Sequence, residues 1–120
     1  MVVSRALVIS DAPDVQQIMV DVLHQERIRA TLAATRHEGI TWLEKETFQV
    51  LFVDLDLPGM DDEFVRRAVS IQPRMSVVVL SDREAIDLAK CRIQVARTDY
   101  LPKPASADDI RAALAQAFQR

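Results

Sequence analysis

Glycine and cysteine are scarce in this sequence of 120 residues. Its two glycines, Gly39 and Gly59, lie 20 positions apart, so the chain cannot form a G-x-G-x-x-G or Walker-type phosphate loop, both of which need clustered glycines. The single cysteine, Cys91, has no partner for an internal disulfide, which favours a reducing cytoplasm. Nucleotide binding through those loops is therefore excluded.

Long apolar runs and an excess of positive charge are also lacking. No apolar run exceeds four residues, whereas a membrane span needs roughly 18–20, and the N-terminus lacks the apolar core of a signal peptide. Lys and Arg number 15 against 18 Asp and Glu, for a formal net charge of −3. The short apolar runs argue against membrane insertion. Because proteins that bind nucleic acid through its phosphates are usually basic, we do not expect direct binding to nucleic acid either.

Apolar residues are nevertheless plentiful, at 49% of the chain, which is enough to bury a core and argues against disorder. Short apolar runs suit strands that are buried on both faces of a parallel sheet. Three such runs of four residues cover 6–9, 50–53 and 77–80. Residues 29–35 and 99–101 are expected to form two further strands.

Segments with helical periodicity separate these strands, because apolar residues recur there at spacings of three and four. The expected helices cover 15–23, 39–46, 64–69, 85–93 and 107–118. Ser106 is the expected N-cap of the last helix, with Asp109 three residues later. Alternating strands and helices predict one α/β domain over residues 1–120, in which helices cover both faces of a five-stranded parallel sheet.

Polar side chains follow the expected strands at their carboxyl ends. Asp11, Asp54, Ser81 and Lys103 stand there, and an open parallel sheet binds its ligands at that edge. Clustered carboxylates are relieved by a hard divalent ion such as Mg²⁺. A lysine and a hydroxyl can bind phosphoryl oxygens, and an aspartate can act as the nucleophile.

Three motifs give the chain a specific resemblance. V-D-L-D-L-P-G-M-D at 53–61, Ser81 at the end of V-V-V-L, and D-Y-L-P-K-P at 99–104 resemble the receiver domain of bacterial two-component response regulators, over nearly the whole chain. The resemblance implies a flavodoxin-like (βα)5 fold. It also implies a cytoplasmic, regulatory rather than enzymatic role, in which a sensor histidine kinase or phosphotransfer protein donates a phosphoryl group.

The resemblance assigns roles at the phosphorylation site residue by residue. Asp54 becomes the phosphoacceptor, forming an aspartyl phosphate, and Lys103 becomes the cation that binds the phosphoryl group. Asp11, Asp54 and the backbone carbonyl of Asp56 become the Mg²⁺ ligands. The Lys103–Pro104 bond is expected to be cis.

The resemblance also implies a conformational switch. Ser81 becomes the switch hydroxyl, and Tyr100 the aromatic side chain that turns inward on activation. The face made by the fourth helix, fifth strand and fifth helix would then bind a second copy or an output domain. Residue by residue, simpler interpretations stay open: Ser81 and Asp82 as N-cap residues of the fourth helix, and Tyr100 as a packing residue.

Three positions depart from the family's pattern or carry an unexplained charge. Ser10 stands where the family has the first of two adjacent acids, so Mg²⁺ affinity should be weakened but not abolished. Asp82 follows the switch hydroxyl, where a small residue is usual. Asp56 could modulate the site through its side chain, or that side chain could simply be solvated.

These departures keep two rival functions open. The first is a pseudo-receiver, a protein-binding module that phosphorylation does not control. The second is a small hydrolase with an aspartyl nucleophile, which is disfavoured because 120 residues leave no cap domain over a substrate.

We predict that the negative charge of Asp82 slows phosphorylation, and replacing Asp82 tests this prediction. Asp82→Ala is expected to accept a phosphoryl group from a small phosphodonor several-fold faster than the wild type, because the change removes a negative charge from the approach to Asp54. Intact-mass measurements at matched Mg²⁺ concentrations would give both rates. Equal rates would contradict a steric or electrostatic role for Asp82.

Overall fold

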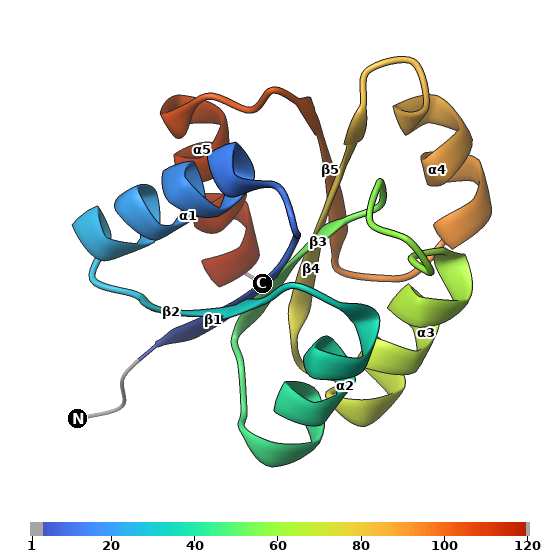
Figure 1. Cartoon of the computed structure of the whole chain (residues 1–120), viewed down its shortest axis with the longest axis horizontal. Helices are drawn as coiled ribbons and strands as arrows, with labels where there is room; N and C mark the ends of the chain where they lie inside the picture. Colours follow the sequence, from blue (N-terminus) through green and yellow to red (C-terminus); the bar gives the residue numbers. More distant parts are fainter. Residues whose placement is uncertain (1–3, 120) are drawn as a thin grey trace.

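The computed structural model describes residues 4–119, which form five strands that alternate with five helices (Figure 1). The strands are β1 (Arg5–Ile9), β2 (Arg29–Ala33), β3 (Val50–Asp54), β4 (Ser76–Asp82) and β5 (Thr98–Lys103). The helices are α1 (Pro13–Gln25), α2 (Arg36–Lys45), α3 (Asp62–Ile71), α4 (Ile86–Ile93) and α5 (Ala107–Phe118). Every expected strand and helix is therefore present.

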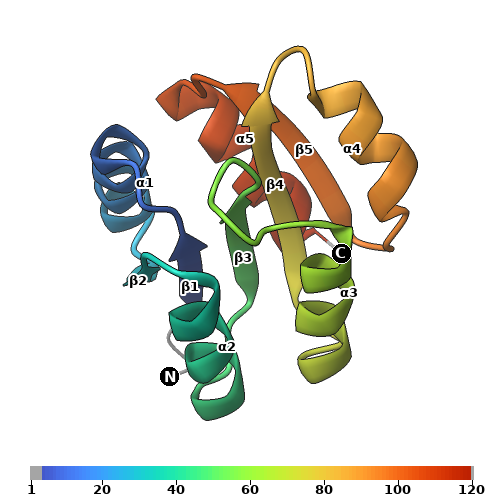
Figure 2. The same cartoon turned by 45° about the vertical axis from the view of Figure 1, so that its right-hand side comes forward.

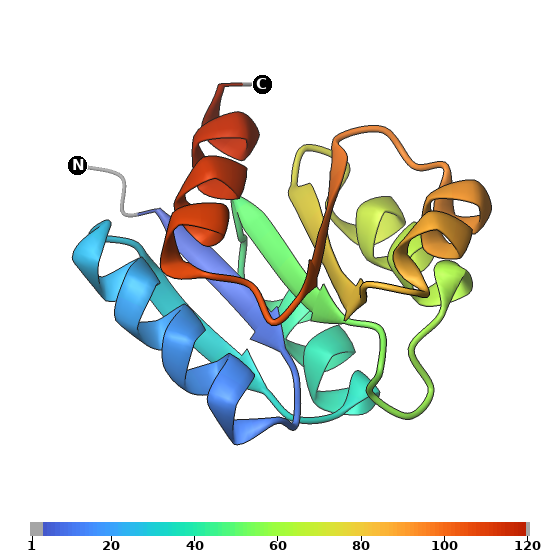
Figure 3. The same ribbon diagram turned by 90° about the horizontal axis from the view of Figure 1, so that it is seen from above.

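The strands form one sheet in the order β2-β1-β3-β4-β5, and every neighbouring pair is parallel. Helices α1 and α5 cover one face, and α2, α3 and α4 cover the other, as Figure 3 shows from above. This is the doubly wound (βα)5 architecture predicted from the alternating pattern. Strand β3 lies at the centre of the sheet, and all five of its residues are buried.

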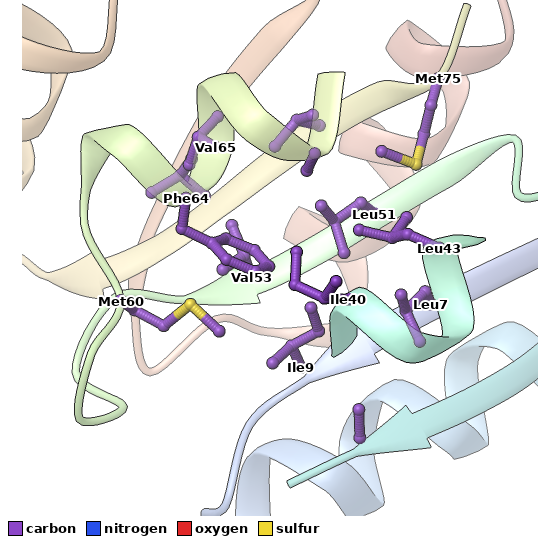
Figure 4. Close-up of a cluster of buried hydrophobic side chains, with 14 of the residues drawn as sticks. Leu7, Ile9, Ile40, Leu43, Leu51, Val53, Met60, Phe64, Val65 and Met75 are labelled. Carbon is purple, nitrogen blue, oxygen red and sulfur yellow. The ribbon is translucent and has the colours of Figure 1, made fainter. Parts of the chain in front are cut away.

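The core divides into two layers because successive strand residues point to opposite faces of the sheet. In β1, Leu7 and Ile9 pack toward α2, α3 and α4, whereas Ala6 and Val8 pack toward α1 and α5. Figure 4 shows the first layer, where Phe64 of α3 lies over the sheet near Val53 and Ile9. Both faces of the central strands are thus apolar, which explains their continuous apolar runs.

Several element boundaries differ from the sequence-based expectations. Helix α2 begins at Arg36 instead of residue 39, because the Thr35 hydroxyl caps it by accepting a hydrogen bond from the backbone N–H of Glu38. Strand β2 ends at Ala33 instead of residue 35, and β5 extends over Thr98–Lys103 instead of 99–101.

The capping predictions had mixed outcomes. The capping box of Ser106 and Asp109 at the start of α5 is confirmed. The N-cap interpretation of Ser81 and Asp82 is wrong, because both residues end β4 and a turn separates them from α4, whose N-cap is Ala85. Within residues 4–119, no helix is long and apolar enough to cross a membrane.

The two phenylalanines Phe52 and Phe118 make a matched test of the core. Phe52 in β3 is 0% exposed and Phe118 in α5 is 44% exposed. Phe52→Ala is expected to lower the free energy of unfolding by about 3–5 kcal/mol, because it leaves a cavity in a packed layer. Phe118→Ala should cost about 1 kcal/mol or less. Urea denaturation would measure both, and similar losses would contradict the core described here.

Candidate functional site

The candidate site lies at the carboxyl edge of the sheet. The strand arrows point toward this edge in Figure 2, where the β3–α3 loop follows the end of β3 and the β4–α4 loop stands above the end of β4. Asp54 is the last residue of β3, Lys103 is the last residue of β5, and Ser10 directly follows β1. Parallel pairing therefore gathers side chains from three strands that are far apart in the sequence.

Asp54 is the centre of this group and is 1% exposed. Its Oδ2 accepts a hydrogen bond from the Ser10 hydroxyl at 2.8 Å. Its Oδ1 accepts one from Lys103 Nζ at 2.8 Å and one from the backbone N–H of Asp56 at 3.0 Å. These hydrogen-bond donors on both oxygens offset the free energy that the Asp54 carboxylate loses when it is removed from water.

Lys103 pairs with two carboxylates at once. Its Nζ lies 2.8 Å from Asp54 Oδ1 and 2.5 Å from Asp56 Oδ2. Burial disfavours the ammonium, but the hydrogen bonds and charges of Asp54 and Asp56 outweigh burial and raise the pKa of Lys103 above its usual 10.5. The Asp56 side chain, although exposed, is thus ion-paired, and the interpretation that it is merely solvated is wrong. The Lys103–Pro104 bond is cis, as expected.

Ser10 is fully buried, at 0% exposed, and its polar atoms are all engaged. Its hydroxyl accepts a hydrogen bond from the backbone N–H of Ala12 at 3.2 Å and donates to Asp54. Its carbonyl accepts a hydrogen bond from Gln16 Nε2 at 2.7 Å. Ser10 therefore connects the start of α1 to the carboxylate of Asp54.

The other predicted residues surround this group without bonding to it. Asp11 is exposed, directly after Ser10. Ser81 is 2% exposed and follows Leu80, the residue that pairs with Asp54 in the sheet. Tyr100 is half-buried and packs against the layer of α2, α3 and α4. Burial raises the pKa of Tyr100, and the negative charge of Asp99 adds to that effect.

A cavity of about 550 Å³ lies beside Lys103, between α1 and the segment that leads from β5 to α5. Asp82, Lys103 and Asp14 line it, together with apolar residues of α1 such as Ile18. Asp82 is exposed and is aligned with Lys103 in the β4–β5 pairing. A negative charge therefore borders the open space next to the predicted phosphate-binding cation.

The oxygen donors at this edge are those that Mg²⁺ takes in proteins. The ion is usually held by one or two carboxylates, with water and phosphate oxygens completing its coordination. Asp54 and Asp11 could supply the carboxylates, and the Asp56 carbonyl a further oxygen. Within residues 4–119, no group of three or more His, Cys, Asp or Glu side chains could hold a metal ion. Two carboxylates and one carbonyl would therefore fit Mg²⁺ whose remaining ligands are water and phosphate oxygens.

Comparison with known proteins identifies the family. The family model for the response regulator receiver domain matches residues 6–115. The chain belongs to this family. Among solved structures, a response regulator receiver domain protein from Clostridium thermocellum is 25% identical, with a TM-score of 0.86 over 98% of this chain and 96% of that one. The chemotaxis response regulator CheY4 of Vibrio cholerae has the same fold, with 20% identity, a TM-score of 0.85 and coverage of 97% and 99%.

Curated relatives include proteins much longer than this chain and one of similar length. The alginate biosynthesis transcriptional regulatory protein AlgB of Pseudomonas putida is 31% identical over 96% of this receiver chain and 26% of its own length. The chain thus spans about a quarter of the length of the first relatives it matches. Sporulation initiation phosphotransferase F of Bacillus subtilis is 22% identical over 92% of this chain and 90% of its own length.

Two contacts between side chains of this site were not predicted from the sequence. The first is the hydrogen bond between Ser10 and Asp54, and the second is the ion pair between Asp56 and Lys103. The first had a signal: once β1 pairs with β3 so that Ile9 meets Val53, the next residues, Ser10 and Asp54, must be neighbours. The second had none, because it depends on how the β3–α3 loop turns.

The ion pair between Lys103 and Asp54 gives a test of stability. Lys103→Met is expected to lower the free energy of unfolding at pH 7 by about 3 kcal/mol, because it leaves the buried Asp54 charge without its cation. Adding Asp54→Asn should recover most of this loss by removing that charge. Urea denaturation of the single and double variants measures both effects. If the second substitution recovered nothing, the cost would lie in packing and not in charge.

Proposed function

We propose that this receiver domain, taken as residues 1–120, is a phosphorylation-controlled switch and that Asp54 is its phosphoacceptor. The domain would act in the cytoplasm, where a sensor histidine kinase or phosphotransfer protein would supply the phosphoryl group. The domain would act as a regulator and not as an enzyme on a separate substrate. The observation that carries the proposal is the buried Asp54 carboxylate at the carboxyl edge, paired at 2.8 Å with Lys103.

The proposed reaction is a phosphoryl transfer to one oxygen of Asp54. A carboxylate oxygen attacks the phosphorus atom, and a P–O bond forms as the bond from phosphorus to the donor's histidine nitrogen breaks. That nitrogen keeps the bonding electron pair, and the histidine leaves as a neutral imidazole because its other ring nitrogen carries a proton. Mg²⁺ bound by Asp11, Asp54 and the Asp56 carbonyl would offset negative charge on the phosphoryl oxygens. Lys103 then binds a phosphoryl oxygen with its ammonium group.

The proposed output is a change of the face formed by α4, β5 and α5. Ser81, at the end of β4, would donate its hydroxyl hydrogen bond to the phosphoryl group. Tyr100, on β5 beside Val79, would then move inward from its half-buried position. This face is the proposed contact for a second copy or for an output domain in a longer protein.

Phosphorylation itself is the first measurement. Wild-type protein incubated with acetyl phosphate and Mg²⁺ is expected to gain one phosphoryl group by intact mass, and the gain should vanish when Mg²⁺ is chelated. Asp54→Ala should gain none, since it lacks the nucleophile. Asp87→Ala, which removes an exposed acid of α4, is the matched control and should react like the wild type.

The absence of any mass gain with acetyl phosphate and with phosphoramidate would overturn the proposal. The domain would then be a pseudo-receiver that binds partners without phosphate. One structural observation favours that alternative: Ser10, where the family has an acid, occupies Asp54 Oδ2. Sustained phosphate release from a phosphomonoester would instead favour a hydrolase.

A further inference from the structure

We infer that Ser10 is a positioning residue that restrains Asp54: its hydroxyl holds Oδ2, the carboxylate oxygen that Lys103 and the backbone N–H of Asp56 leave open for Mg²⁺. The inference rests on the proposed function, and it extends the expected weakening of Mg²⁺ binding. A missing acid only removes a ligand. The contact seen here adds an interaction in the metal-free protein, which would be weakened when Mg²⁺ takes the same oxygen.

The hydrogen-bond pattern fixes the direction of this contact. A serine hydroxyl has one proton to donate, and the Ser10 oxygen already accepts the N–H of Ala12 at 3.2 Å. The remaining partner is Asp54 Oδ2 at 2.8 Å, and an ionised carboxylate can only accept. The Ser10 proton therefore points at Asp54, and a lone pair of the Ser10 oxygen faces the N–H of Ala12.

Burial makes the contact strong. Ser10 is 0% exposed and Asp54 is 1% exposed, so bulk water does not compete for the carboxylate. Its other oxygen, Oδ1, is held by Lys103 and the N–H of Asp56. Both Asp54 oxygens are thus satisfied by the chain's own donors. Hydrogen bonds to charged groups are stronger than those between neutral groups. Losing the hydrogen bond from Ser10 to Asp54 therefore costs free energy.

This cost falls mainly on the metal-free state. Mg²⁺ at Oδ2 would draw electron density from that oxygen, so the hydrogen bond from Ser10 would be weaker in the metal-bound protein than in the metal-free protein. An interaction that is stronger in one of two states shifts the equilibrium toward that state. Removing the hydroxyl should therefore tighten Mg²⁺ binding. If Ser10 were instead a neutral oxygen ligand of the metal, removing it would weaken binding, so the two roles predict opposite signs.

The deciding experiment is a Mg²⁺ titration by isothermal calorimetry of the wild-type protein and Ser10→Ala. We expect the Mg²⁺ dissociation constant of Ser10→Ala to be about tenfold lower, the factor that corresponds to losing one hydrogen bond to a charged group in the metal-free state. Ser10→Cys, which keeps the side chain's approximate size with a weaker donor, should fall between the two and covers the case in which Ser10→Ala does not fold.

Ser76→Ala is the matched control. Ser76 is a buried serine, 3% exposed, at the start of β4 and thus at the opposite edge of the sheet. Its hydroxyl donates a long hydrogen bond of 3.4 Å to the carbonyl of Ala117. Loss of a buried hydroxyl there should leave Mg²⁺ affinity unchanged. An unchanged or higher Mg²⁺ dissociation constant for both Ser10→Ala and Ser10→Cys would overturn the inference.

Phosphorylation by acetyl phosphate, measured on the same proteins, separates this inference from the proposed function. Below saturating Mg²⁺, Ser10→Ala should react several-fold faster than the wild type. If Mg²⁺ binds more tightly to Ser10→Ala but neither protein is phosphorylated, the restraint stands and the proposed function fails. If the wild type is phosphorylated with Mg²⁺ but the substitutions do not tighten Mg²⁺ binding, the function stands and the restraint fails.

Discussion

The buried carboxylate of Asp54 is the constraint on which the organisation of the site depends. Strand β3 is buried along its whole length, so an acid at its end loses most of its hydration and needs donors from the protein. The parallel sheet supplies them, since β1 and β5 end at the same edge as β3. Lys103 reaches Asp54 from β5, although β4 lies between the two strands. The order of the strands thus decides which side chains can neutralise this acid.

Much of the fold was predictable because the central strands carry a strong signal. Strands β1, β3 and β4 are buried on both faces, and their apolar runs in the sequence are continuous for that reason. Strand β2 lies at the edge of the sheet and mixes exposed with buried residues, so its end was predicted two residues too late. The start of α2 was missed because it depends on one hydrogen bond to the Thr35 hydroxyl.

The site was predictable as a set of residues but not as a set of bonds. Topology places Asp54 and Lys103 at one edge, and that much follows from the strand pattern. The distribution of one ammonium between Asp54 and Asp56 depends on the geometry of the β3–α3 loop, where the backbone N–H of Asp56 also turns back to Asp54. Side-chain contacts of this kind are decided by competition among nearby donors and acceptors, on which periodicity carries no information.

The donors around Asp54 also differ in what phosphorylation would do to them. The ammonium of Lys103 is attracted to a carboxylate and to a phosphoryl group alike, so its interaction can pass from one to the other at little cost. The hydroxyl of Ser10 stabilises the carboxylate oxygen that it touches, and this hydrogen bond would be weakened when a cation takes the same oxygen. Binding that stabilises the resting state and the reacting state equally does not slow a reaction, whereas binding confined to the resting state does. If the Ser10 contact is strongest in the resting state, as we infer, Ser10 is a position at which this receiver domain's reactivity can be set without changing Asp54 or Lys103.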